Sequence, residues 1–328
     1  MSLSLRSVLT QCLAGAVAAV SFLAVAHAQS PYPSRPITLI NPYAAGGPAD
    51  TLARGLATAL ETRLKQSVIV DSKAGGGATI GTGYVARAKP DGYTLLISTS
   101  AGHVVTPLMQ RIAYDGINDF AFIAVVANQP NMLVVNPDLG VDTLQGLIAM
   151  AKKDPAKLNY ASAGTGGATH LGAEAFLQSA QIKITHVPYA GAAPALKDIL
   201  GGHLQMGMLN LSATRAFIEQ GKLNALAYGG PKRTALFPQV PTMSEAGFPA
   251  GELSTWYTLS APKGTPADAL EVLRKAVAEV NADPAYQKIL ASLGAERMEM
   301  TPAETTAFVQ RDKVAMTKLL GSLNLLEK

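Results

Sequence analysis

The sequence predicts an α/β protein of two domains with a cleft between them. Short runs of β-branched residues alternate with helical patterns, which is typical of parallel sheets flanked by helices. The 328 residues are long for one hydrophobic core and sufficient for two. Two apolar segments, 119–137 and 254–266, contain no helical pattern and indicate crossings between the domains. We therefore expect a discontinuous first domain, 29–126 and 255–328, and an inserted second domain, 127–254.

The first thirty residues have the pattern of a secretory signal peptide. Arg6 precedes an apolar run from Leu13 to Ala26, and small residues at Ala26 and Ala28 form a cleavage site. We expect residues 1–28 to be removed after Ala28, so that the mature chain is periplasmic without a stable membrane anchor. The single cysteine, Cys12, lies before the apolar run rather than after it. A lipid anchor and disulfides are therefore not expected.

The charge pattern argues against a nucleic-acid partner. The full chain has a formal net charge of +4, and of its charged residues only Arg6 falls in the expected signal peptide. The lysines and arginines form no cluster, whereas surfaces that follow a phosphate backbone need clustered cations. A small anionic ligand is compatible with this mildly basic chain.

The segment LINPYAAGGPADTLARGLATAL predicts a strand, a glycine turn and a helix. Pro48 suits the first helical turn, and Asp50 is favourable near the positive end of the helix dipole. Gly46 and Gly47 allow a ligand to approach the backbone. Two interpretations remain open here: an anion site at the exposed amides of the helix start, or an ordinary strand-to-helix turn.

A second segment, NYASAGTGGATHLGAEAF, repeats this plan in the other domain. Its glycines expose backbone amides, and its hydroxyls lie on Ser162, Thr165 and Thr169. The segment lacks the lysine of a P-loop, and Tyr160 occupies the first glycine position of a nucleophile elbow. It therefore suits a carboxylate. A third glycine stretch, KAGGGATIGTGYVARA, is interpreted as a turn that supports the wall of the cleft.

The histidines do not indicate a metal site. His103, His170, His186 and His203 are not paired at the spacing of metal ligands. We expect no metal and no cofactor. His170, which is four residues before Glu174 on the predicted helix, is interpreted as a polar residue at the edge of the cleft.

Five segments together resemble one known family. They are YPSRPITLINPYAAGGPAD, ARAKPDGYTLLIST, KLNYASAGTGGATHL, ITHVPYAGAAPALKDILGG and QVPTMSEAGFP, in this order. Through these five segments the chain closely resembles the periplasmic solute-binding proteins of tripartite tricarboxylate transporters, the TctC or Bug family. The similarity covers essentially the whole mature chain.

The resemblance implies a two-lobed, type II periplasmic-binding fold that closes on a small organic carboxylate and delivers it to membrane permease subunits. It implies that Asp50 organises the first loop. Three further candidates for ligand binding are chosen from their positions in the sequence: His170, Tyr189 and Asn210. The ligand-binding residues implied by the family motifs are Tyr43, Ala45, Gly46, Gly47, Ser98, Thr99, Ser100, Ser162, Gly164, Thr165 and Gly166.

The chain departs from the family pattern at two positions. Leu209 stands where the family often has an aspartate, and His103 stands where an aliphatic residue is common. If position 209 faces the cleft, the loss of a carboxylate disfavours an amino-acid ligand. A dicarboxylate or an aromatic carboxylate is then the better expectation.

Two other functions remain as alternatives. A periplasmic sensor for a receptor kinase would use the same ligand-driven closure. A secreted serine hydrolase would need a serine with a base and an orienting acid, and no motif supplies that arrangement. We therefore expect a binding protein rather than an enzyme.

Overall fold

The computed structural model describes residues 31–154 and 157–327, so the expected signal peptide, 1–28, lies outside the described residues. Strands in the described chain follow the hydrogen-bonded order β2-β1-β3-β9-β4-β7-β5-β6, and β8 also pairs with β4. The strands are β1 Ile37–Asn41, β2 Val68–Ser72, β3 Thr94–Thr99, β4 Phe120–Val135, β5 Asn159–Ser162, β6 Thr185–Pro188, β7 Met206–Asn210, β8 Asn224–Tyr228 and β9 Ser254–Pro262.

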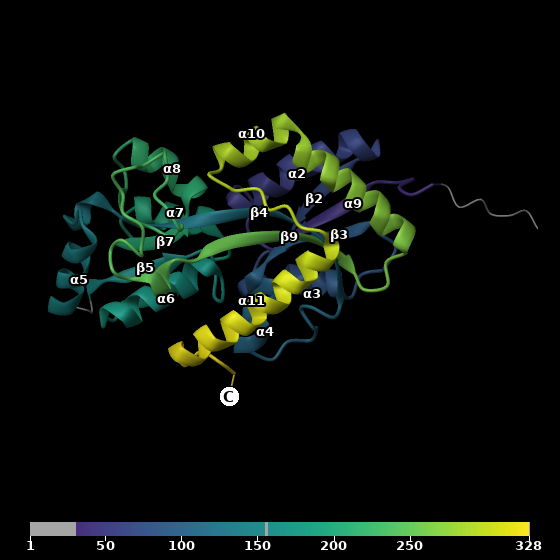
Figure 1. Ribbon diagram of the computed structural model, residues 1–328. Coiled ribbons are helices and arrows are strands. Elements are labelled where there is room, and N and C mark those ends of the chain that lie inside the picture. The colour runs from purple at the N-terminus through teal and green to yellow at the C-terminus, as the bar shows by residue number, and fades with distance from the viewer. Residues whose placement is uncertain (1–30, 155–156, 328) are drawn as a thin grey trace, which may run out of the picture.

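Two strands, β4 and β9, connect the two lobes (Figure 1). The first part of β4 pairs with β9 as far as Pro130, and from Asn131 onward β4 pairs with β7 and β8. Both segments that we interpreted as crossings are thus strands. The residue boundaries assigned above to the two lobes stay a prediction.

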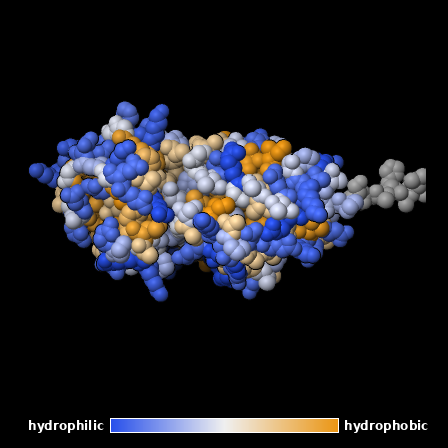
Figure 2. Space-filling view, turned by 90° about the horizontal axis from the view of Figure 1, so that it is seen from above, coloured by the Kyte–Doolittle hydropathy of each residue, from blue (hydrophilic) through white to orange (hydrophobic). Residues whose placement is uncertain are grey.

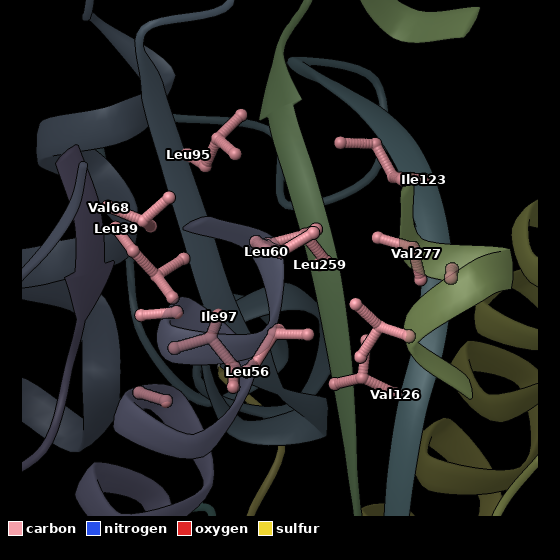
Figure 3. Packing of buried hydrophobic residues seen from close by; sticks show 14 of the residues in the cluster. Leu39, Leu56, Leu60, Val68, Leu95, Ile97, Ile123, Val126, Leu259 and Val277 are labelled. Carbon is pink, nitrogen blue, oxygen red and sulfur yellow. The ribbon is translucent and has the colours of Figure 1, made fainter. Parts of the chain in front are cut away.

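The first lobe is built on β1, β2 and β3. Helix α2 places Leu52, Leu56 and Leu60 in its core without exposed surface, as the four-residue spacing of the leucines predicts. Figure 3 shows Leu56 and Leu60 packing toward Leu259 from β9. The helices of this lobe are α2 Pro48–Leu64, α3 Thr79–Ala86, the π-helix η2 Ala101–Val105, α4 Thr106–Met109, α9 Ala267–Ala282 and α10 Pro284–Ser292; η1 Gly76–Ala78 is a 3₁₀ turn.

The second lobe is built on β5 to β8 and has a hydrophobic cluster on each side of its sheet. Tyr160 and Phe176 are fully buried in one cluster, and Leu209 is fully buried in the other. Its helices are α5 Leu144–Lys153, α6 Ala168–Ala180, α7 Ala192–Leu200 and α8 Leu211–Glu219, and η3 Pro137–Leu139 and η5 Pro249–Gly251 are 3₁₀ turns.

The C-terminal helix α11, Pro302–Leu323, contacts both lobes. It packs against β4 and η2, and at its end Ser322 O accepts a hydrogen bond of 2.7 Å from Gln178 Nε2 on α6. Figure 1 shows this helix in yellow alongside the crossing strands. A capping box between Thr301 and Glu304 fixes where it begins.

The sheet is more mixed than the mainly parallel lobes that the alternating pattern predicts. Pairings of β1 with β2 and β3, and of β5 with β6 and β7, are parallel. Strands β4 and β9 run in opposite directions between the lobes, and their pairing with each other, that of β9 with β3, and those of β4 with β7 and β8 are all antiparallel. The α/β two-lobed class is confirmed, and the antiparallel part comes from the crossings.

The surface is largely hydrophilic on the face shown in Figure 2, where the hydrophobic patches are interspersed with hydrophilic residues. No helix within residues 31–154 and 157–327 combines the length and apolar character needed to cross a membrane.

Candidate functional site

A cavity lies where strands of both lobes end. The segment after β1 and the last residue of β3 reach it from the first lobe, and the segments after β5 and β6 and the last residue of β7 reach it from the second, as expected at the carboxyl ends of parallel strands. Its volume is about 30 Å³, which exceeds the roughly 10–15 Å³ that one water requires. It is lined by Tyr43, Ala44, Gly47, Pro48, Ala49, Thr99, Ala163, Gly167, Ala168, Thr169, Ala192, Asn210, Thr255 and Tyr257.

Three helices begin at this cavity. Their N-cap residues are Gly47 of α2, Gly167 of α6 and Gly191 of α7, and none of these caps has a side-chain hydrogen bond. The first amides of an α-helix have no partner within the helix, and together they carry about half a positive charge. One start from the first lobe and two from the second thus favour an anion in the cavity.

The lining residues carry no charged side chain. Polar atoms come instead from hydroxyls and one amide. The Tyr43 hydroxyl lies 2.6 Å from Thr99 Oγ1, and burial raises the pKa of Tyr43 to about 12, so the phenol stays neutral. The Tyr257 hydroxyl donates to Gln129 Oε1 at 3.2 Å, and burial raises its pKa as well. An anion here is met by dipoles rather than by a counter-charge.

The amide of Asn210 belongs to a hydrogen-bonded group at the end of β7. Its Nδ2 donates to Asn131 Oδ1 and to Thr255 Oγ1, both at 3.1 Å. Asn131 Nδ2 in turn donates to Leu253 O at 2.8 Å. These bonds hold the Asn210 side chain in one orientation at the wall of the cavity.

Asp50 ties the first loop to helix α2. Its Oδ2 accepts from Gly46 N at 3.0 Å and from Arg54 Nε at 2.9 Å. Burial alone would raise the pKa of this carboxyl, but the bonds from Arg54 and Gly46 outweigh burial and lower it. Asp50 therefore stays ionised and holds the loop in front of the helix start.

The glycine loop of the second lobe uses its amides internally. Ala163 N donates to Thr169 Oγ1 at 3.1 Å, Gly164 N to Ser162 Oγ at 3.2 Å, and Gly166 N to His170 Nδ1 at 3.2 Å. These three amides hold the loop to its own lobe. The amides that remain toward the cavity are those of the first turn of α6.

Two stacked histidines lie beneath this loop. The rings of His170 and His186 are 4.2 Å apart, and His186 Nε2 lies 2.7 Å from Ser162 Oγ. Burial lowers the pKa of His170 to about 3, with a further contribution from His186, and lowers the pKa of His186 to about 4. Both rings are therefore neutral at neutral pH, which suits the acceptor role of His170 toward the loop.

The lobes touch on both sides of the cavity, so the structure is closed. On one side Ala44 N donates to Ala190 O at 2.8 Å across the lobes. On the other side, a Cβ atom placed on Gly77 would lie 2.5 Å from Thr165 O. Gly77 and Thr165 thus form a seam where the closed lobes meet. The third glycine stretch contributes to this seam, in agreement with its interpretation as a support of the cleft wall.

Four of the predicted ligand-binding residues line the cavity: Tyr43, Gly47, Thr99 and Asn210. The others do not line it. Several of these bond to protein groups instead, as Ser98 does with Thr82, Ser100 with Asp312 and Tyr189 with Asp198. The remaining residues away from the lining are Ala45, Gly46, Ser162, Gly164, Thr165, Gly166 and His170.

Sequence reasoning missed the third helix start and the two residues of β9 that line the cavity. Ala192 follows a glycine after β6, the pattern that was recognised in the other two loops but not here. Thr255 and Tyr257 reach the cavity because β9 crosses behind it, and their pairing with β4 has no sequence signal.

The two departures from the family pattern lie away from the cavity. Leu209 packs in a hydrophobic cluster of the second lobe, so its replacement of an aspartate carries no information about the ligand. His103 is buried against Phe120 and Phe122 and lies 2.7 Å from Gly116 O through Nδ1. In the described residues, no three His, Cys, Asp or Glu side chains gather as metal ligands.

Comparison with known proteins agrees with this architecture. The family model described as "Tripartite tricarboxylate transporter family receptor" matches residues 52–325. Protein BugT of Bordetella pertussis is 37% identical over 280 residues, 85% of this chain and 86% of BugT. Similar solved structures include two from R. palustris. The first, a protein with adipate, has a TM-score of 0.86 at 33% identity, covering 89% of this chain and 98% of its own.

The second structure, MatC from Rhodopseudomonas palustris with bound malate, has a TM-score of 0.84 at 27% identity, covering 88% of this chain and all of its own. A family match over most of the chain and a relative above one third identity lead to one conclusion. The chain belongs to the tripartite tricarboxylate transporter receptor family.

Proposed function

We propose that the protein is a periplasmic solute-binding protein that captures a small carboxylate and delivers it to the permease subunits of a tripartite transporter. The observation that carries the proposal is the uncharged cavity between the lobes, with three helix starts directed at it. Adipate and malate in the two similar structures support the ligand class. The family supports the permease partner and the periplasmic location.

Hydrolysis is not part of this proposal. Ser162 and His186 lie 2.7 Å apart, but Ser162 is fully buried and does not line the cavity. Among the described residues, Glu174 bonds to Tyr160 rather than to His186. The pair therefore lacks both access to a substrate and an orienting acid.

Thermal unfolding against a panel of mono-, di- and tricarboxylates tests the ligand class. An acid present at about 100 times its Kd stabilises the folded state by roughly 2.7 kcal/mol, a shift of several degrees. The corresponding amides are the control, because they match the acids in shape but carry no charge. If no acid raises the midpoint, or if the amides raise it equally, the carboxylate proposal is wrong.

A proline substitution tests the role of the helix starts. Ala168→Pro removes the first amide hydrogen of α6 at a position where proline fits a helix. We expect the Kd for a bound acid to rise at least tenfold. Ala267→Pro makes the same change at the exposed first residue of α9, away from the cavity, and should leave the Kd unchanged. Equal Kd values for both variants would contradict the proposed contact.

A further inference from the structure

The orientation of the Asn210 amide follows from a backbone carbonyl. Leu253 O can only accept, so the Asn131 atom 2.8 Å from it is the amide nitrogen. Asn131 therefore presents its oxygen to Asn210. The Asn210 atom 3.1 Å from that oxygen must then be nitrogen, because two carbonyl oxygens at this distance would repel each other.

With the nitrogen fixed, Asn210 presents its oxygen as a bare acceptor. Both Nδ2 hydrogens are used, one on Asn131 Oδ1 and one on Thr255 Oγ1. Within the described part of the chain, Oδ1 accepts no hydrogen bond, and this oxygen keeps some accessible surface. Asn210 is only 3% exposed and lines the cavity, so the accessible surface of this oxygen faces the ligand space.

This acceptor differs from the other groups around the cavity. The helix amides donate, and the hydroxyls of Tyr43, Thr99, Thr255 and Tyr257 are already bonded to protein groups, with the Tyr257 hydrogen on Gln129 Oε1 and the Thr255 hydrogen on Asn131 Oδ1. A carboxylate has no hydrogen to offer to Asn210 Oδ1. A ligand that is only a carboxylate would leave this oxygen unpaired, which is unfavourable in an enclosed site.

We propose that the ligand is a hydroxycarboxylate whose hydroxyl donates to Asn210 Oδ1, which makes Asn210 a specificity-determining residue. The inference rests on the proposed function, since it requires a carboxylate in this cavity. A hydroxyl fits better than an ammonium group. No carboxylate lines the described cavity, and a buried ammonium without a counter-charge is strongly unfavourable.

Calorimetric titration with matched pairs of acids tests the inference. The pairs are malate and succinate, 2-hydroxyglutarate and glutarate, and lactate and propionate, each differing by one hydroxyl. For the pair whose length fits the cavity, we expect the hydroxy acid to bind at least tenfold more tightly. Sites built to bond a hydroxyl discriminate against the analogue that lacks it.

Two variants assign the preference to Asn210. Asn210→Leu removes the acceptor at similar volume and should make the two acids of a pair bind equally. Thr255→Val removes a partner of both Asn210 and Asn131 but leaves the bonds from Asn131 to Leu253 O and from Asn210 to Asn131, so the preference for the hydroxy acid should persist even where overall affinity falls. Unfolding of each variant without ligand shows whether it is folded.

The outcomes separate this inference from the proposed function. Equal binding of both acids by the unmodified protein overturns the hydroxyl preference and leaves carboxylate binding intact. A preference that survives Asn210→Leu also overturns the assignment. If no acid binds in any pair or in the wider panel, the proposed function itself fails.

Discussion

Replacing Gly77 with alanine should weaken ligand binding without touching the ligand. The added Cβ would lie 2.5 Å from Thr165 O in the opposite lobe, whereas ordinary contacts begin near 3.4 Å. The seam must therefore open by about 0.9 Å, or the neighbouring backbone must shift by as much. Overpacking of this kind typically costs about 1–3 kcal/mol, which corresponds to a Kd that is roughly 5- to 150-fold weaker.

The backbone strain of this substitution can be separated from the clash. Gly77 has a φ of +62°, where an alanine costs about 1–2 kcal/mol whether the lobes are open or closed. That strain lowers the unfolding midpoint of the free protein. The contact with Thr165 exists only between closed lobes, so it acts on the Kd.

Gly221→Ala is the matched control. Its φ is +67°, and a Cβ there would meet nothing within 4 Å. Both variants carry the same backbone strain, and Gly77→Ala should lose more stability because its Cβ also meets Thr106 Oγ1 of its own lobe at 3.0 Å. Only Gly77→Ala should lose affinity in calorimetric titration, with a smaller ligand-induced compaction in small-angle scattering. If the two variants bind a carboxylate equally well, the seam does not limit closure and the reasoning is refuted.

Three further predictions concern stability. Burial lowers the pKa of His103 to about 4 and that of His170 to about 3, so the unfolded state binds more protons than the folded state below about pH 6.5. Each histidine should therefore reduce the free energy of unfolding by roughly 2–3 kcal/mol when the pH falls from about 7 to about 4.5. Equal urea midpoints at about pH 7 and about pH 4.5 would contradict this. Asp50→Ala should lower the free energy of unfolding by about 1–3 kcal/mol, because the Gly46 amide loses its charged acceptor. The Arg54 side chain is 58% exposed, so Arg54→Ala should lower it by less than about 1 kcal/mol in the same urea assay. Leu56→Ala should destabilise the first lobe by about 2–5 kcal/mol while the carboxylate preference stays the same, and a changed preference would show that this core shapes the cavity.

The sequence predicts the elements of the site better than it predicts the atoms that face the ligand. Strand, glycine and helix signals are local, so the loops after β1 and β5 were placed correctly from spacing. Which amides remain available depends on side chains that fold back onto the loop. Gly166 N is used by His170, and Gly164 N by Ser162, and neither bond has a sequence signature. Tyr257 is a cavity residue through strand pairing alone.

An uncharged cavity couples occupancy to closure. The helix starts at Gly47 and Gly167 belong to different lobes, and in the closed lobes their free amides face the same small space. Without a ligand those amides are enclosed and lack an acceptor, which disfavours closure. A carboxylate supplies acceptors to both lobes together, so it binds the closed form more tightly than the open one, and only such a difference in affinity can shift the equilibrium. A fixed lysine or arginine in either lobe would attract the anion in the open form as well and would reduce that difference.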